Sequence, residues 1–230
     1  YPAVSDKIIA QSEIPLPPLD EQKRIAAILD QADDLRRKRQ RAIERLAELA
    51  HALFNETFGE GKGDSRGWEA RPVRDLCELV RGSSPRPKGD PRYFGGSVPR
   101  LMIADITRDG MYVTPKIDSL TEEGARRSRE MPAGGVVMAV SGAVGLPAIL
   151  NVDACIHDGF VGFRNIDRSI LPEYLYWFLL SNREENRAQG TGAIWVNLTT
   201  DQVKSFLVPV PPIELQKRFV EKTNVIIAQS

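Results

Sequence analysis

Three side chains of this sequence have the chemistry of a nucleophilic catalytic triad: Ser141, His157 and Asp158. In such a triad a carboxylate orients a histidine, which takes the proton of a serine hydroxyl. A histidine and an aspartate that are neighbours in the chain cannot easily orient one another, and no nucleophile-elbow pattern surrounds the serine. We therefore interpret these three residues as turn residues between strands.

Other catalytic patterns are absent or incomplete. The glycines of GAVG, residues 142–145, lack the rest of a phosphate-binding fingerprint and a following helix. The tetrapeptide DPRY, residues 90–93, is similar to the Asn/Asp-Pro-Pro-aromatic signature of amino-methyltransferases, but Arg92 replaces the second proline. Cys77 and Cys155 have neither the spacing of a zinc site nor the number needed for a disulfide framework. The sequence thus predicts a chain that is not an enzyme and holds no cofactor or metal.

Residues 81–100 form the most informative charged segment, rich in glycine, proline and arginine. They hold five basic residues and one acidic residue, a charge of +4, in a chain whose net charge is zero. Arg and Lys on a loop can bind phosphates, and arginine can also read base edges with two hydrogen bonds. The alternative is an ordinary polar surface, neutralised by acidic residues elsewhere. The candidate DNA-binding residues are Arg81, Ser83, Ser84, Arg86, Lys88, Arg92, Arg100, His157 and Asn197. A second basic group follows at Arg126, Arg127 and Arg129.

Two segments that lie 194 residues apart are nearly the same. Residues 14–25 read IPLPPLDEQKRI and residues 208–219 read VPVPPIELQKRF, with six identities in twelve positions. The prolines fix φ and withhold backbone donors, which favours an extended segment at a sheet edge. The acidic residues that follow favour the first turn of a helix. The chain is therefore predicted to leave a globular unit on an extended segment and to enter a helix, twice.

The first of these helices is predicted to be long, because residues 19–58 contain no glycine or proline and Gly59 follows. Forty residues make a rod of about 60 Å. Apolar residues recur along it at steps of three and four, as in the seam of a coiled coil. The seam consists of Ile25, Ile28, Ala32, Leu35, Ala42, Leu46, Leu49 and Leu53, with Arg39 as a polar interruption. Such a rod needs a partner helix, and residues 213–230 supply only its first turns.

A mixed α/β domain is predicted over residues 68–212, after a linker at 59–67. We expect strands over 98–103, 135–140, 148–152 and 159–163, and loops over 81–100 and 190–197. A helix is expected over 172–189, with Leu171, Leu175, Phe178 and Leu179 turned inward. The fold class is α+β, with this domain joined to a long coiled-coil helix. No targeting segment or membrane span is predicted, so we expect a soluble, cytoplasmic protein.

These features together resemble the DNA-specificity (S) subunit of type I restriction–modification systems. The similarity lies in the two junctions and in VPRLMIADI, PAGGVVMAVSGAVG, CIHDGFVGF and EYLYWFLL between them, and it covers nearly the whole chain. It implies a target-recognition domain over 68–212, conserved helices at 19–58 and 213–230, and the tail of a preceding recognition domain in residues 1–18.

The resemblance also implies a function. In this family each recognition domain reads one half of a bipartite double-stranded DNA target, and the helices hold two such domains apart. Modification subunits with S-adenosylmethionine methylate adenine, and restriction subunits join the assembly, so that S-adenosylmethionine, ATP and Mg²⁺ are expected on partners. The alternative is a coiled-coil scaffold that does not read DNA. The chain is either a fragment or a half-length subunit that pairs with a second copy of itself or with a different half.

Overall fold

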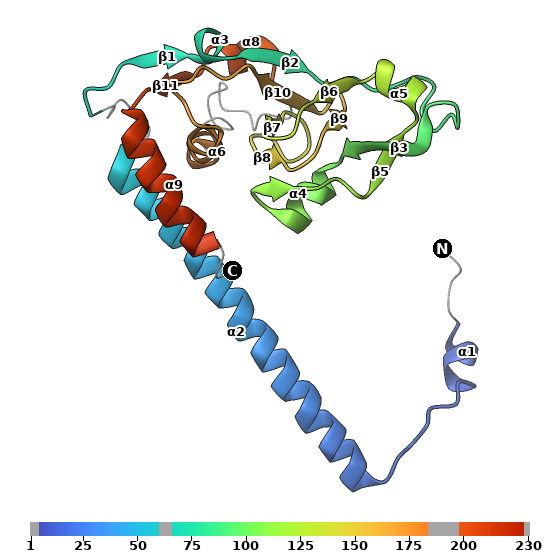
Figure 1. Ribbon diagram of the computed structural model, residues 1–230. Helices are drawn as coiled ribbons and strands as arrows, with labels where there is room; N and C mark the ends of the chain where they lie inside the picture. Colours follow the sequence, from blue (N-terminus) through green and yellow to red (C-terminus); the bar gives the residue numbers. More distant parts are fainter. Residues whose placement is uncertain (1–4, 60–65, 184–197, 228–230) are drawn as a thin grey trace. The chain divides into compact units, whose positions relative to one another are not determined.

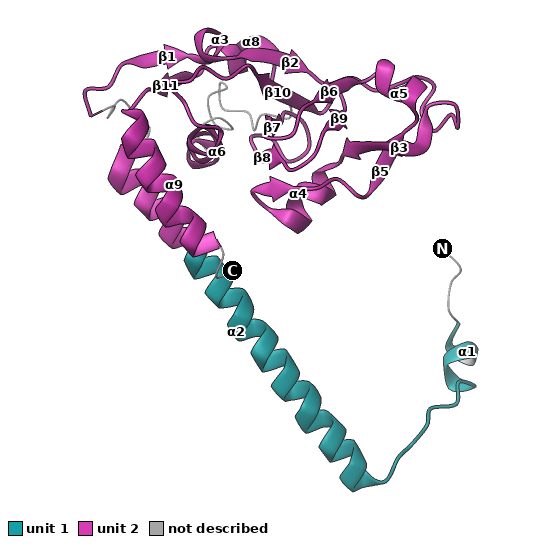
Figure 2. Ribbon diagram, in the orientation of Figure 1, with its two compact units in different colours: residues 1–47, 230 teal, residues 48–229 magenta. Residues whose placement is uncertain are grey.

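The computed structural model describes residues 5–59, 66–183 and 198–227 (Figure 1). The chain divides into two compact units, residues 1–47 with Ser230 and residues 48–229, which have different colours in Figure 2. No helix in the described ranges is long and apolar enough to cross a membrane.

The first unit consists of α1 (Asp6–Ala10), an extended proline-rich segment and most of α2 (Leu19–Phe58). The short helix α1 was not expected from the sequence. The predicted bounds of α2 are confirmed: acidic residues occupy its first turn, and it ends before Gly59, whose φ of 89° glycine adopts readily. Large apolar side chains of the seam, such as Ile28 and Leu35, are exposed along this part of the helix. The first unit by itself therefore leaves an apolar face uncovered.

The described strands of the second unit form three sheets, and their pairs are antiparallel except β3 with β9 and β4 with β8. The five-stranded sheet has the order β2 (Glu78–Arg81), β10 (Phe160–Arg164), β7 (Val136–Ala139), β8 (Pro147–Leu150), β4 (Tyr112–Val113). The four-stranded sheet has the order β5 (Asp118–Leu120), β3 (Phe94–Leu101), β9 (Ala154–Ile156), β6 (Arg129–Met131). In the third sheet, β1 (Ala70–Pro72) pairs with β11 (Leu207–Pro209) and so joins the start of the domain to its end.

Within the described residues, six helices and the last part of α2 complete the second unit. They are α3 (Val73–Leu76), α4 (Ile103–Asp109), α5 (Glu122–Arg126), α6 (Pro172–Ser181), α8 (Thr200–Lys204) and α9 (Ile213–Ile227). Helix α6 buries six consecutive residues and packs against β7 and β8. An aromatic cluster joins α6 and α9 to the end of α2: the rings of Phe54 and Phe58 contact those of Tyr174 and Phe219, with centroids 4.9–5.8 Å apart. Figure 1 shows α9 lying along this end of α2.

This cluster changes the register of the predicted seam. Leu49 is exposed, whereas Ala50, Phe54 and Phe58 are buried. The two phenylalanines present more apolar surface than the leucines of the predicted stripe, so their face turns toward the domain. The predicted seam is therefore wrong at Leu49, whereas its last residue, Leu53, is half-buried and packs against the same core.

The strands expected over 135–140, 148–152 and 159–163 are confirmed as β7, β8 and β10. The strand expected over 98–103 is displaced, because β3 runs from Phe94 to Leu101 and α4 begins at Ile103. Asp105 ends the strand there: its carboxylate accepts a hydrogen bond from the Met102 amide (3.0 Å) and caps α4. The loop expected over 81–100 is wrong at both ends, since Arg81 closes β2 and residues 94–100 belong to β3.

The helix expected over 172–189 is found as α6, which ends at Ser181. Leu175, Phe178 and Leu179 are buried as predicted, while Leu171 is half-buried at the N-cap. The rest of that expected helix and the expected loop over 190–197 lie outside the described residues.

Each of the two repeated junctions contains one equivalent hydrogen bond, and the second junction has two more. Gln22 and Gln216 each donate to the proline carbonyl five residues earlier, at 2.8 Å and 2.9 Å. Gln216 is fully buried, donates also to the Ser169 carbonyl (2.7 Å) and accepts from the Leu171 amide (2.9 Å). One buried glutamine thus adds three hydrogen bonds to the contacts that hold the second junction to its domain.

Candidate nucleic-acid interface

Most of the predicted DNA-binding residues lie on or beside one loop, residues 82–93, which connects β2 to β3. The backbone amide of Gly82 donates to the Phe160 carbonyl (2.9 Å), and that of Ser83 donates to the Ile156 carbonyl (3.1 Å). A Cβ on Gly82 would lie 2.0 Å from the carbonyl oxygen of His157, so glycine is required for this approach. The first part of the loop is thereby fixed against the turn between β9 and β10, residues 157–159.

Arg100 lies inside the domain, beneath this loop. It is 8% exposed, pairs with Asp118, and donates to the Ser84 hydroxyl (2.9 Å). The Ser84 hydroxyl in turn donates to Asp158 Oδ1 (2.6 Å), and this hydrogen bond is the main cause that lowers the pKa of Asp158. We predicted Arg100 as a DNA contact on a surface loop. The structure places it in a strand as a buried guanidinium that positions Ser84.

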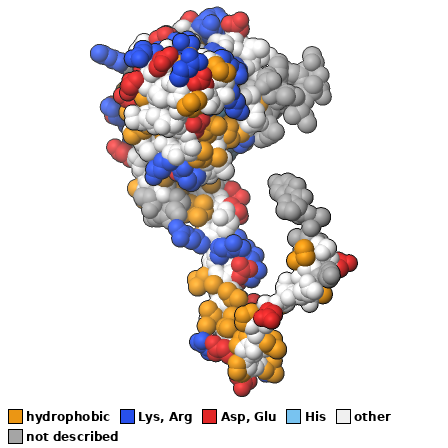
Figure 3. Space-filling view, turned by 90° about the vertical axis from the view of Figure 1, so that its right-hand side faces the viewer, with side chains coloured by type: hydrophobic (Ala, Val, Ile, Leu, Met, Phe, Trp, Pro, Cys, Tyr) orange, Lys and Arg blue, Asp and Glu red, His pale blue; other side chains and the backbone are white. Residues whose placement is uncertain are grey.

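Three other predicted residues present their charge at the surface. The Arg86 side chain is 71% exposed, and its Nη2 lies 3.6 Å from Asp158 Oδ2. Arg92 is also exposed and donates to both carboxylate oxygens of Asp90, with Nη2 2.7 Å from Oδ2. Lys88 is exposed between them in the chain. Figure 3 shows Lys and Arg side chains mixed with Asp and Glu side chains on the globular part of this unit.

Arg127, from the second basic group, joins the same surface. Its guanidinium lies 4.6 Å from the ring centroid of Tyr93, and that of Arg92 lies 5.2 Å from the same centroid. Two hydrogen bonds join Ser83 to the segment that carries Arg127. The Ser83 hydroxyl donates to the Arg127 carbonyl (3.4 Å), and the Ser83 carbonyl accepts from the Ser128 hydroxyl (2.7 Å). Arg127 is not among the DNA-binding candidates predicted from the sequence. The only sequence signal was its place in a second basic group.

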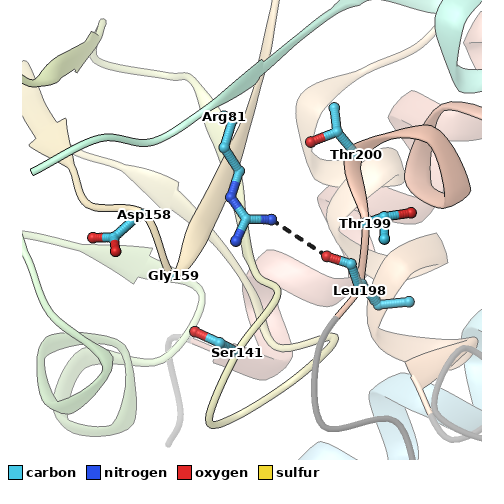
Figure 4. Close-up of a pocket in the computed structure, with 7 residues that line it drawn as sticks. All are labelled: Arg81, Ser141, Asp158, Gly159, Leu198, Thr199 and Thr200. Carbon is cyan, nitrogen blue, oxygen red and sulfur yellow. Dashed lines mark hydrogen bonds between the residues drawn. The ribbon is translucent and has the colours of Figure 1, made fainter.

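A pocket of about 570 Å³ opens beside the loop (Figure 4). Its lining residues are Arg81, Ser141, Asp158, Gly159, Leu198, Thr199 and Thr200. In Figure 4 the Arg81 side chain points across the pocket, and it donates to the Leu198 carbonyl (3.3 Å). Asp158 therefore belongs both to the basic surface and to the pocket wall. Asn197, also a predicted contact, lies outside the described residues.

His157 is half-buried, and its ring packs edge-on against Phe160 with centroids 4.8 Å apart. Its Nδ1 accepts a hydrogen bond from the Gly159 amide (2.9 Å), and burial lowers the pKa of the ring. Asp158 Oδ1 is 3.9 Å from this Nδ1, too far for the hydrogen bond of a triad. The interpretation of His157 and Asp158 as turn residues is confirmed, since both lie between β9 and β10.

The comparison with known families identifies the domain that carries this surface. Residues 1–45 and 65–228 match the model described as type I restriction modification DNA specificity domain. The chain belongs to this family. The match extends over both units, including the junctions and the loop with its exposed arginines.

Individual proteins similar to this chain are specificity subunits as well. The putative type I restriction enzyme MjaX specificity subunit of Methanocaldococcus jannaschii is 23% identical over 247 residues, which cover 97% of this chain and 56% of the relative. The crystal structure of the HsdS subunit from Thermoanaerobacter tengcongensis matches all of this chain and 56% of that one, with 25% identity and a TM-score of 0.61. A chain from a structural study of type I R-M complex assembly matches with 26% identity and a TM-score of 0.67, over 57% of its length. The specificity-domain chain thus spans a little over half the length of these relatives.

Proposed function

We propose that this chain binds double-stranded DNA in a sequence-specific manner, reads one half of a bipartite target, and catalyses no reaction itself. The observation that carries the proposal is the pair of exposed arginines, Arg86 and Arg92, on a loop whose base is fixed from inside by Arg100 and Ser84. A preorganised loop loses little conformational entropy when it binds, so its side chains can discriminate between sequences. Its charge suits a polyanionic partner.

The contacts divide by their chemistry. Lys88 and Arg92, both exposed, suit phosphates, which position the protein without reading sequence. Arg86 suits the O6 and N7 atoms of a guanine, because its ion pair with the exposed carboxylate of Asp158 is long, at 3.6 Å. Truncation of Arg86 is then expected to cost about 1–3 kcal/mol at particular base pairs only.

The helices supply the second part of the proposal. The apolar face that α2 leaves exposed in the first unit suits a partner helix, as in a coiled coil. We assign it to assembly with another specificity half, which a second copy of this chain can provide, and place modification and restriction subunits beside the helices. S-adenosylmethionine, ATP and Mg²⁺ then belong to those partners, and the complex acts in the cytoplasm.

Charge reversal tests this function against a scaffold that does not read DNA. The variant Arg86→Glu/Arg92→Glu is expected to assemble with the modification subunits but to lose target-dependent methylation. The matched control is Arg74→Glu, since Arg74 is about as exposed and also lies near a carboxylate, that of Asp75 (3.8 Å). Size-exclusion chromatography reports the assembly, and incorporation of labelled methyl groups reports the activity. A double variant that assembles and still methylates the target fully contradicts the proposed DNA reading.

A further inference from the structure

The carboxylate of Asp158 lies on the basic surface, beside Arg86. It follows His157 in the β9–β10 turn, is 57% exposed, and lies between Arg86 and the pocket that contains Arg81. Figure 4 shows it at the edge of that pocket, on the opposite side of Arg81 from Thr199 and Thr200. A surface that binds a polyanion loses affinity by carrying a negative charge, so its position calls for an explanation.

The turn that carries Asp158 is rigid. The Gly159 amide donates to His157 Nδ1, and the Phe160 amide donates to the His157 carbonyl, both at 2.9 Å. The Gly159 carbonyl accepts from the Val140 amide (2.8 Å), which fixes the turn to the end of β7. A Cβ on Gly159 would lie 2.5 Å from the His157 ring, so the turn has no room to rearrange.

The two oxygens of this carboxylate have different surroundings. Oδ1 accepts the Ser84 hydroxyl at 2.6 Å, and Ser84 is itself held by the buried Arg100. Within the described residues the one polar partner of Oδ2 is Arg86, whose Nη2 lies 3.6 Å away, too far for a hydrogen bond. One oxygen thus fixes the side chain, and the other presents a charged acceptor at the surface. The hydrogen bond from Ser84 lowers the pKa of Asp158, so the group is ionised at neutral pH.

An ionised carboxylate accepts hydrogen bonds and donates none. In the major groove the only donors on base edges are the exocyclic amino groups, N4 of cytosine and N6 of adenine, while guanine and thymine present acceptors that a carboxylate repels. We infer that Asp158 is a specificity-determining residue, whose free oxygen accepts a hydrogen bond from the exocyclic amino group of a cytosine or an adenine in the target. The inference rests on the proposed function, because it names a base group that the proposed DNA reading uses.

The test measures whether Asp158 and one amino group act on each other. The DNA target of the full chain, in complex with its modification subunit, is first determined by selection from random duplexes. Each adenine of the target is then replaced by purine and each cytosine by 2-pyrimidinone, which lack only the amino group. Wild-type complex is expected to lose roughly 10- to 100-fold in affinity at one position. The position that responds distinguishes cytosine from adenine.

The variant Asp158→Asn completes the cycle. Its amide oxygen can still accept from Ser84, while an NH₂ donor replaces the free oxygen. It is expected to bind the natural target about as weakly as the wild type binds the substituted one, and to lose nothing further on the amino-free DNA. The control is Asp75→Asn, since Asp75 is 54% exposed and lies 3.8 Å from an arginine, and it should behave as wild type.

The outcomes separate the inference from the proposed function. A wild-type complex that selects no sequence overturns both. If the wild type selects a target and Asp158→Asn loses as much as the wild type at every substituted position, DNA reading stands and the inference is overturned. If Asp158→Asn does not fold, the wild-type series decides: a target with no adenine or cytosine that responds also overturns the inference.

Discussion

Replacement of Gln216 by alanine tests how the second junction is held to its domain. The side chain is fully buried and makes three hydrogen bonds, to the carbonyls of Ser169 and Pro211 and from the amide of Leu171. Its removal leaves these backbone groups without a partner, at about 1–3 kcal/mol for a buried unsatisfied group. The carbonyls have second lone pairs and suffer less than the amide, so we expect a total loss of about 3–5 kcal/mol.

The assay is unfolding in urea, followed by tryptophan fluorescence, because all three tryptophans lie within residues 48–229. For a domain of this size the loss corresponds to a melting temperature lower by roughly 10 °C. The repeat supplies the matched control, Gln22→Ala. Gln22 is half-buried and, within the described residues, makes one hydrogen bond, to the Pro17 carbonyl. It lies in the first unit, which contains no tryptophan, so its replacement should change the unfolding free energy from this assay by less than about 1 kcal/mol. Equal losses for the two variants, or a loss below about 1 kcal/mol for Gln216→Ala, would refute this reasoning.

Three further predictions concern the second unit. Gly82→Ala should destabilise this unit by at least about 2 kcal/mol and weaken DNA binding, because the new Cβ would lie 2.0 Å from the His157 carbonyl oxygen. Urea unfolding and a DNA-binding titration measure the two effects, and a variant unchanged in both contradicts the prediction. Phe58→Ala should cost about 3–5 kcal/mol of unfolding free energy, since the ring is buried among four aromatic rings; a loss near zero would mean that the end of α2 does not pack there. Arg108 lowers the pKa of Asp109 to about 2, from 3.8, so this pair contributes stability above pH of about 4 that is lost as the pH falls toward 2. Because Arg108 is partly exposed, we expect the pair to contribute only about 1 kcal/mol to the unfolding free energy. Urea unfolding of the wild type and of Asp109→Asn across that pH range measures this contribution, and parallel pH profiles of the two proteins would contradict it.

The elements that the sequence predicted well are those that local pattern determines. Helix α2 has the expected ends because forty residues without glycine or proline leave the chain no earlier place to stop. The strands β7, β8 and β10 are buried apolar runs bounded by glycines and polar turns, a pattern that depends little on distant residues.

The features that the sequence missed depend on contacts between distant residues. Arg100 is buried because β3 pairs with β9, fifty-five residues further on, and nothing near Arg100 in the chain indicates this. The tertiary fold also brings Arg127 to Tyr93. The sequence indicates only a turn residue at Asp158, because its contacts with Ser84 and Arg86 join residues more than seventy positions apart in the chain. The sequence also missed that Phe54 and Phe58, rather than Leu49, form the buried face at the end of α2, because the aromatic residues of α6 and α9 give these rings a larger apolar contact.

The central claim is that the loop of residues 82–93 reads DNA sequence. The most direct measurement is selection of random double-stranded DNA by the full chain in complex with its modification subunit, followed by sequencing of the bound fraction. We predict one enriched half-site motif for the wild type, and for Arg86→Ala a motif that loses preference at one or two positions while the others keep theirs. Enrichment of no motif, or the same motif at the same strength with Arg86→Ala, would contradict the account.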